Sequence, residues 1–301
     1  MLFMNNNLIK TLMSFTLCFI GVYLLFGTVL KSRSNLTNDI DPAVIRPLSS
    51  EDMSSWSMTD LMGFLESSRM TNRSACSVFF AFGGEIHVDV LYRDGQKSVC
   101  LDSGVRPALN NCLVYSFGID DEWSFDDDMA RLGCEVYAFD PSMEATDHNR
   151  SARVHFYQMG IWHRNGLIVV DRKNPDAVWT VMTLSSIYKR FQSVHGDRPI
   201  DYLKIDVEGS EWDIIPEIVA SGMLDRVKQL GIEIHMAYGA VSTDLVRSRV
   251  EMLRSLERDH GMIPFDYKIN FSCKGHVVGA PEHYGCAEIA FFNSKYRNQS
   301  H

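Results

Sequence analysis

Two carboxylates, Asp206 and Glu208, stand where the apolar run in IDYLKIDVEGSEWDII gives way to a glycine. A carboxylate at the end of a buried strand can remove a proton from a hydroxyl group, or hold a divalent ion through oxygen ligands. Acids in a first helical turn also complement the helix dipole, which is the simplest interpretation of Glu211. Asp206 emerges from the strand itself, so we predict Asp206 and Glu208 as catalytic residues.

A third candidate is His235, which ends the apolar run VKQLGIEIHM at residues 227–236. A single histidine at a strand end is more often a hydrogen-bonded structural group than a base, and both interpretations stay open. Neither a C-x-x-C pair nor a Cys/His ligand spacing suggests a zinc site, so we predict no metal ligands.

A second pattern lies upstream, in NCLVYSFGIDDEWSFDDDMARLGCEVYAFDP from Asn111 to Pro141. It predicts a strand, a turn at Gly118, an acidic helix and a second strand that ends in Asp140. In open parallel sheets the first turn uses glycine for close backbone approach, and an acid about 20 residues later binds ribose hydroxyls. The alternative is that Gly118 only ends a strand and that Asp140 caps the loop at Pro141.

Hydrophobic periodicity predicts further elements around these two stretches. The expected strands cover residues 77–89, 97–101, 154–162, 168–170, 265–272 and 287–293, and the expected helices cover 58–70, 183–191, 212–219 and 244–260. A polar loop is expected through Pro175, and a glycine-rich connection, KGHVVGAPEHYG, between the last two strands. Alternating strands and helices favour an α/β fold with a mostly parallel sheet.

Composition limits the classes of partner. The chain has 301 residues, of which 46% are hydrophobic and 22% charged, enough for one α/β domain with an appendage. Its net charge is -9 and it contains no block of basic residues. We therefore expect no nucleic-acid partner.

The N-terminus contains an uncharged apolar run from Leu12 to Leu30, long enough to cross a hydrocarbon core of about 30 Å. We expect a membrane anchor, with a cleaved signal peptide as the alternative. The expected segments are an anchor at 1–31, a stem at 32–56, a cover over the nucleotide edge at 57–96 and a catalytic domain at 97–301.

Glycosylation sequons and cysteines favour a lumenal or extracellular domain on a single-pass protein. The sequons begin at Asn35, Asn72, Asn149, Asn270 and Asn298, and such sites are used only in a lumenal domain. Six cysteines follow the apolar run, an even number that suits disulfides in an oxidising compartment. Cys273 and Cys286 are a candidate bridge if the last two strands form a hairpin, and the alternative places them on opposite faces.

On these residues, the sequence resembles the class I methyltransferases of the FkbM-like kind. The resemblance runs from about Lys97 to Asn293 and is carried by VYSFGIDDEWSFDDDMARLGCEVYAFDPS, LKIDVEGSEWDII and LGIEIH. KIDVEG is the more specific motif, while VYSFGI followed by FDPS is typical of a narrower group of membrane-anchored or secreted methyltransferase-like proteins.

The resemblance implies a Rossmann-like fold with a seven-stranded sheet in the order 3-2-1-4-5-7-6 and an antiparallel last strand. It implies S-adenosylmethionine as the cofactor, with Asp140 on the ribose and residues 158–161 beside the adenine. Asp206 and Glu208 would then lie where the methyl donor meets the acceptor. The residues that it assigns to the cofactor are Phe117, Gly118, Ile119, Asp140, Pro141, Gln158, Gly160 and Ile161.

Methyl transfer from a sulfonium needs alignment of the donor and acceptor and removal of the acceptor's proton. O-methylation, for instance of a sugar or glycan hydroxyl, is the expected reaction, with a divalent ion as an optional second cofactor. The first alternative is a degenerate fold that serves as a binding or scaffold protein. The second, a dinucleotide-dependent oxidoreductase, requires a G-x-G-x-x-G turn that the sequence does not contain.

Overall fold

The computed structural model describes residues 52–67, 69–87, 92–171, 174–236, 241–271 and 276–297. The predicted anchor at residues 12–30 lies outside these ranges, as do Asn35, Cys273 and Asn298. No helix within the described ranges is both long and apolar enough to cross a membrane.

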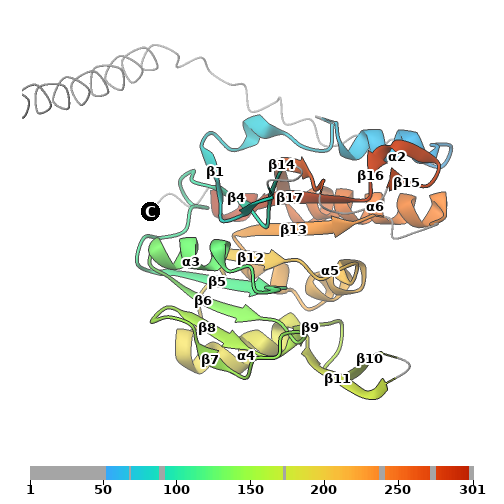
Figure 1. Cartoon of the computed structure of the whole chain (residues 1–301). Coiled ribbons are helices and arrows are strands. Elements are labelled where there is room, and N and C mark those ends of the chain that lie inside the picture. The colour runs from blue at the N-terminus through green and yellow to red at the C-terminus, as the bar shows by residue number, and fades with distance from the viewer. Residues whose placement is uncertain are drawn as a thin grey trace, which may run out of the picture. The chain divides into compact units, whose positions relative to one another are not determined.

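A mixed sheet of eight strands organises the described chain (Figure 1). Five neighbouring strands, from β8 to β13, are parallel, whereas β17 runs antiparallel to both of its neighbours. The strands lie in the order β14 (Met262–Ile269), β17 (Cys286–Asn293), β13 (Gln229–His235), β12 (Tyr202–Ile205), β5 (Cys112–Phe117), β6 (Cys134–Phe139), β8 (Val154–Tyr157) and β7 (His148–Asn149).

The short strand β7 was not expected from the sequence. It pairs antiparallel with β8 at one edge, so the sheet has eight strands rather than seven. Numbered along the chain without β7, the other strands lie in the order 3-2-1-4-5-7-6.

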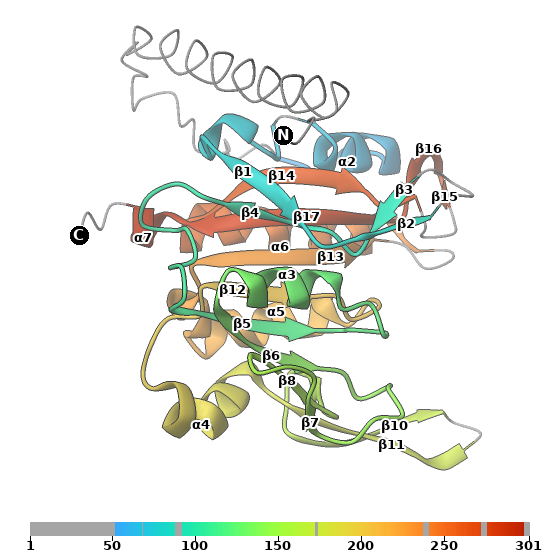
Figure 2. The same ribbon diagram turned by 60° about the vertical axis from the view of Figure 1, so that its left-hand side comes forward.

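Helices cover both faces of the sheet, which explains why all six residues of β5 are buried. Leu113, Tyr115 and Phe117 share a core with α4 (Leu184–His195), α5 (Glu211–Ala220) and α6 (Thr243–His260). Val114 packs on the opposite face against α3 (Ser124–Arg131). Figure 2 shows α3 in front of the sheet and α5 and α6 behind it.

Capping residues determine where the helices start and end. Thr183 accepts a hydrogen bond from the backbone of Ser186 at the start of α4, and Ser242 accepts one from Leu245 at the start of α6. Gly261, with φ of 70°, ends α6 in the left-handed conformation that glycine adopts readily. The predicted helices at 183–191 and 244–260 are confirmed, and α4 continues four residues further, to His195.

The N-terminal segment packs mainly over one half of the sheet. α2 (Met58–Leu65) packs on α6, and β4 (Lys97–Cys100) contacts β13 and β17, while β1 (Phe79–Phe82) and the Gly83–Gly84 turn after it reach α3. The apolar face of α2 joins the core shared with α6, which draws the segment over the β13, β17 and β14 half. Met53, assigned to the stem, is also buried in this core.

The remaining short elements include a three-stranded sheet beside the main one. β9 (Gly160–Ile161) pairs with β11 (Asn174–Met182), which pairs with β10 (Gly166–Asp171). The predicted loop through Pro175 is therefore wrong, because Pro175 lies near the start of β11. The others are η2 (Arg73–Ala75), β2 (Glu85–His87), β3 (Tyr92–Asp94), η3 (Met223–Arg226), β15 (His276–Val277), β16 (Ala280–Tyr284) and α7 (Ser294–Arg297).

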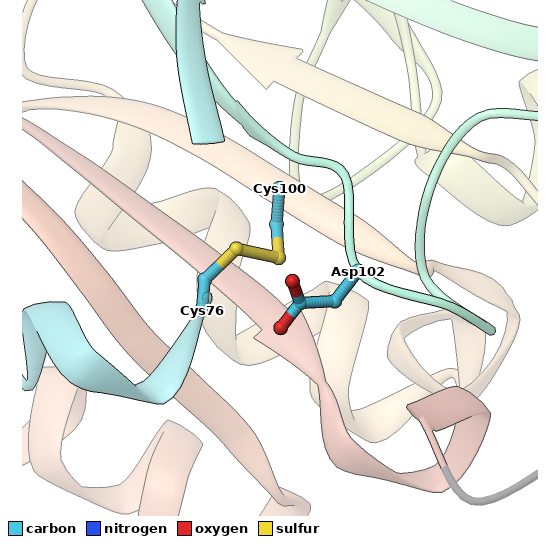
Figure 3. Close-up of side chains that lie close together, drawn as sticks. All are labelled: Cys76, Cys100 and Asp102. Carbon is cyan, nitrogen blue, oxygen red and sulfur yellow. A yellow bond between two sulfur atoms is a disulfide. The ribbon is translucent and has the colours of Figure 1, made fainter. Parts of the chain in front are cut away.

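Two disulfides connect cysteines that both lie within the described residues. Cys76 bridges to Cys100 of β4, and Cys112 bridges to Cys134, which joins the first residues of β5 and β6. Figure 3 shows the first bridge beside Asp102, whose carboxylate accepts hydrogen bonds from the backbone after Cys76. Cys286 is also disulfide-bonded, while Cys273, its predicted partner, lies outside the described residues.

The Cys112–Cys134 bridge gives a first prediction. The bridged residues are 22 positions apart, so a Cys112→Ala, Cys134→Ala variant should lose about 3 kcal/mol of unfolding free energy in the chain-entropy model. Urea unfolding without reductant measures this, with dithiothreitol-treated wild-type chain expected to lose at least as much. An unchanged urea midpoint in the variant would contradict the prediction.

Candidate active site

The turn after β5 brings the ends of two neighbouring strands into contact. Gly118 has φ of 78°, and a Cβ atom there would lie 1.6 Å from the backbone oxygen of Asp206. Lys204 of β12 donates a hydrogen bond from Nζ to the backbone oxygen of Gly118. Glycine is therefore required at residue 118 by the close approach of β12, whether or not a ligand also approaches.

Asp140 holds this turn from the next strand. One carboxylate oxygen accepts the backbone N–H groups of Ile119 (2.8 Å) and Asp120 (3.1 Å), and the other accepts the N–H and hydroxyl of Ser142 (2.8 and 2.5 Å). A carboxylate offers about four acceptor positions. The loop-capping interpretation that the sequence left open thus describes the bonds that Asp140 makes here.

The residues flanking Gly118 belong to the core. Phe117 is buried and stacks on Phe139 with ring centroids 4.7 Å apart, and Ile119 is buried beside α3. Tyr115 is buried, with its hydroxyl 2.8 Å from Nε2 of His195. Phe117 and Ile119 therefore position the turn by packing.

The segment after β8 lies against the loop that follows Asp140. A Cβ atom on Gly160 would be 3.0 Å from Cγ of Pro141, so these two predicted cofactor residues are neighbours. Ile161 is buried, whereas Gln158 is exposed and donates from Nε2 to the backbone oxygen of Met143 at 2.8 Å. The structure thus brings Pro141, Gly160 and the Gln158 loop together at one edge.

A buried lysine pairs with a carboxylate just after β12 and with another in β17. Nζ of Lys97, on β4, lies 3.2 Å from Oδ2 of Asp206 and forms an ion pair with Glu288 of β17. Glu233 of β13 completes the group and accepts a hydrogen bond from Nδ2 of Asn270 at 2.7 Å. We call Lys97, Asp206, Glu233 and Glu288 the buried charge cluster.

Within the buried charge cluster, the carboxyl groups of Asp206 and Glu233 have different protonation states. Burial alone raises the pKa of Asp206, but Lys97 and Lys204 outweigh it and hold the pKa well below its usual range. Burial, followed by the charges of Asp206 and Glu288, raises the pKa of Glu233 to about 10. Asp206 is therefore ionised near neutral pH and Glu233 is protonated.

His235 lies at the end of β13, beside this cluster. Its Nδ1 is 3.3 Å from Oε1 of Glu211, and its Nε2 is 3.7 Å from Oε2 of Glu208 and 4.0 Å from Oε1 of Glu233. The side chain of Glu208 is 76% exposed, while that of His235 is 2% exposed. The three predicted catalytic residues, Asp206, Glu208 and His235, therefore meet at one edge of the sheet.

The spacing of these groups also bears on metal binding. Ligand atoms of Asp206, Glu208 and His235 lie within 4.8 Å of one another, as do those of Asp206, Glu233 and Glu288. The ammonium of Lys97 already supplies positive charge at Asp206, and it would repel a second cation in either group. We assign no metal ligands to these residues.

Sequence reasoning missed Lys97, Glu233 and Glu288, and it gave Glu211 only a capping role. The available signal was a single charge inside an otherwise apolar strand, as in KSVC, LGIEIH and CAEIAFFN. Asn270 shows the opposite error, since this predicted sequon residue is 4% exposed and bonded to Glu233 and Asp94. A glycan on Asn270 does not fit this fold.

Comparison with known proteins identifies the family. A family model described as "Methyltransferase domain" matches residues 75–278. "Probable methyltransferase-like protein 24" of Homo sapiens is 30% identical over 181 residues, which is 57% of this chain and 48% of the relative. The same-named protein of Rattus norvegicus is 30% identical over 199 residues, 58% of this chain and 53% of the relative.

The chain spans about half the length of the curated relatives it matches. The family match and the names of both relatives support an enzyme, and they confirm the resemblance to methyltransferases. The family model covers more than half of the chain, so the chain belongs to the methyltransferase domain family.

Proposed function

We propose that the chain transfers a methyl group from S-adenosylmethionine to an oxygen atom of its acceptor. The observation that carries this proposal is the meeting of Gly118, Asp206, Glu208 and His235 where parallel strands end, the edge at which open α/β sheets bind ligands. Membership in the methyltransferase domain family supports the reaction class. A sugar or glycan hydroxyl is the proposed acceptor.

The turn from Phe117 to Ile119 and the loops at Pro141 and Gly160 are the proposed walls of the cofactor site. The cofactor supplies an electrophilic methyl group on a positively charged sulfur. The backbone oxygen of Asp206 approaches Gly118, so these walls lie next to the proposed catalytic residues. Alignment of the acceptor with the methyl group then accounts for a large part of the expected acceleration.

A second candidate function is a binding or scaffold protein on the same fold. It is favoured by Asp140, since four hydrogen bonds already occupy the carboxylate expected to bind the ribose. Calorimetric titration of the full chain with S-adenosylmethionine separates the two functions. Binding followed by methyl transfer supports the enzyme, and absence of heat at millimolar cofactor favours the scaffold.

Asp140 provides a prediction for the cofactor site. Asp140→Asn keeps one acceptor oxygen and removes the charge, and Asp140→Ala strands the N–H groups of Ile119 and Asp120. Both changes should weaken S-adenosylmethionine binding by roughly 1 to 3 kcal/mol in calorimetry. Glu144→Ala, an exposed acid in the same loop, is the control. An unchanged dissociation constant in folded Asp140 variants would remove Asp140 from the site.

The chain is proposed to be a single-pass membrane protein that is anchored through residues 12–30. Its catalytic domain would then lie in the lumen or outside the cell. Support comes from the Cys76–Cys100 and Cys112–Cys134 disulfides, which persist in oxidising compartments. Asn72 and Asn149 are exposed, as glycan acceptors must be.

Glycan mapping tests this location. The chain expressed in human cells should lose mass on glycosidase treatment, and peptide mass spectrometry should find glycans at Asn72 and Asn149 but none at Asn270, which is buried. Asn72→Gln and Asn149→Gln should each remove one glycan. A glycosidase-insensitive full-length chain whose C-terminus is cut by cytosolic protease would reverse the proposed orientation.

A further inference from the structure

Glu211 and His235 form a buried contact that a helix cap alone does not require. Oε1 of Glu211 accepts the backbone N–H of His235 at 2.6 Å and lies 3.3 Å from its Nδ1. Oε2 of the same carboxylate accepts the N–H of Gly209 at 2.9 Å. Glu211 and His235 are 0% and 3% exposed, so one carboxylate ties the turn after β12 to the end of β13.

The contact determines which way the imidazole ring faces. With Glu211 as the acceptor at Nδ1, the proton of a neutral His235 lies on Nδ1 and the lone pair lies on Nε2. Nε2 faces Glu208, 3.7 Å away, whose exposed side chain marks the side open to solvent. The backbone oxygen of His235 is held as well, by Nε1 of Trp212 at 2.9 Å.

The other acids of the site are poorer proton acceptors. Lys97 keeps Asp206 ionised and holds its pKa low, so Asp206 binds a proton weakly. Glu233 is protonated near neutral pH and has no capacity for a second proton. Glu208 is exposed to solvent, which leaves His235 as the group with both an orienting partner and a suitable proton affinity.

We propose that Glu211 and His235 act as a dyad in which Glu211 orients the imidazole and Nε2 of His235 takes the proton of the acceptor hydroxyl. The inference rests on the proposed O-methylation. As the acceptor oxygen bonds to the methyl carbon, the carbon–sulfur bond breaks and its electron pair stays on sulfur. The hydroxyl proton moves to Nε2, giving an imidazolium beside Glu211 that releases the proton to solvent after turnover.

The charges around the imidazole ring determine how the rate of methyl transfer should depend on pH. Burial alone lowers the pKa of His235, but Glu211, Glu208 and Asp206 outweigh it and raise the pKa overall. Among the described residues, Glu233 and the Arg249 guanidinium, which bonds the His235 backbone oxygen, also lie close to the ring. Since only neutral imidazole accepts a proton, methyl transfer should rise with pH through a value above the ordinary 6.5.

The first measurement needs no acceptor. In ¹⁵N NMR of the full chain, the His235 signal, assigned by its loss in His235→Asn, should show the Nδ1–H tautomer and a pKa above 6.5. Glu211→Gln should lower this pKa, whereas Asp213→Asn should not, since Asp213 is an exposed acid in the same helical turn. An Nε2–H tautomer, or a pKa unaffected by Glu211→Gln, would overturn the orienting role.

The second measurement follows tritium transfer from S-adenosylmethionine to a panel of methyl glycosides. His235→Asn keeps a donor for Glu211 but has no base, so the rate should fall about 100-fold or more with unchanged cofactor binding. Glu211→Gln should also reduce the rate, by up to about 10⁴-fold, and move the acidic limb of the pH profile to lower pH. Asp213→Asn should match the wild type.

Three results would refute the base role. The first is retained activity in His235→Asn, and the second is an acidic limb that does not move in Glu211→Gln. The third is activity lost in EDTA and restored by Mg²⁺, since Nε2 would then serve a metal. If the wild type binds S-adenosylmethionine but methylates no glycoside, the base role falls with the proposed function, while the tautomer still decides whether Glu211 orients His235.

Discussion

The described structure depends on the burial of one ammonium group. Lys97 is 1% exposed and can be charged there only because Asp206 and Glu288 lie beside it. Removing one partner from a buried ion pair typically costs about 3 to 5 kcal/mol, since the remaining charge is stranded. Lys97 therefore fastens β4 to β12 and β17, and with it the N-terminal segment to the sheet.

The Lys97 ammonium also makes two neighbouring acids differ in protonation. Asp206 follows β12 and Glu233 lies in the adjacent parallel strand β13, yet Lys97 keeps the first ionised while burial keeps the second protonated. His235 sits next to both and receives its orientation from Glu211. One edge of the sheet thus offers a fixed negative charge, a neutral acid and a base, the kind of separation by environment that lets an enzyme work near neutral pH.

The presence of glycine at residue 118 and of an acid at residue 140 is explained by the fold without any ligand. The glycine is needed because β12 passes too close for a side chain, and Asp140 is needed because it accepts the N–H groups of that turn. Both roles build a rigid edge beside Pro141 and Gly160. A preorganised turn of this kind is what the proposed cofactor site would need.

The sequence alone determined the α/β class, the main helices, the strands β5, β6, β12 and β13, and the placing of Asp206, Glu208 and His235 at strand ends, because periodicity and glycine turns are local signals. Tertiary structure decided what these groups contact. Lys97, Glu233 and Glu288 come from separate strands whose pairing no local pattern specifies, and Asn270 is a sequon by its neighbours but buried by the fold. Glu211 was interpreted as an acid of a first helical turn because the sequence shows only its local neighbours. Its partner, His235, lies 24 residues away and meets it only when α5 packs beside β13.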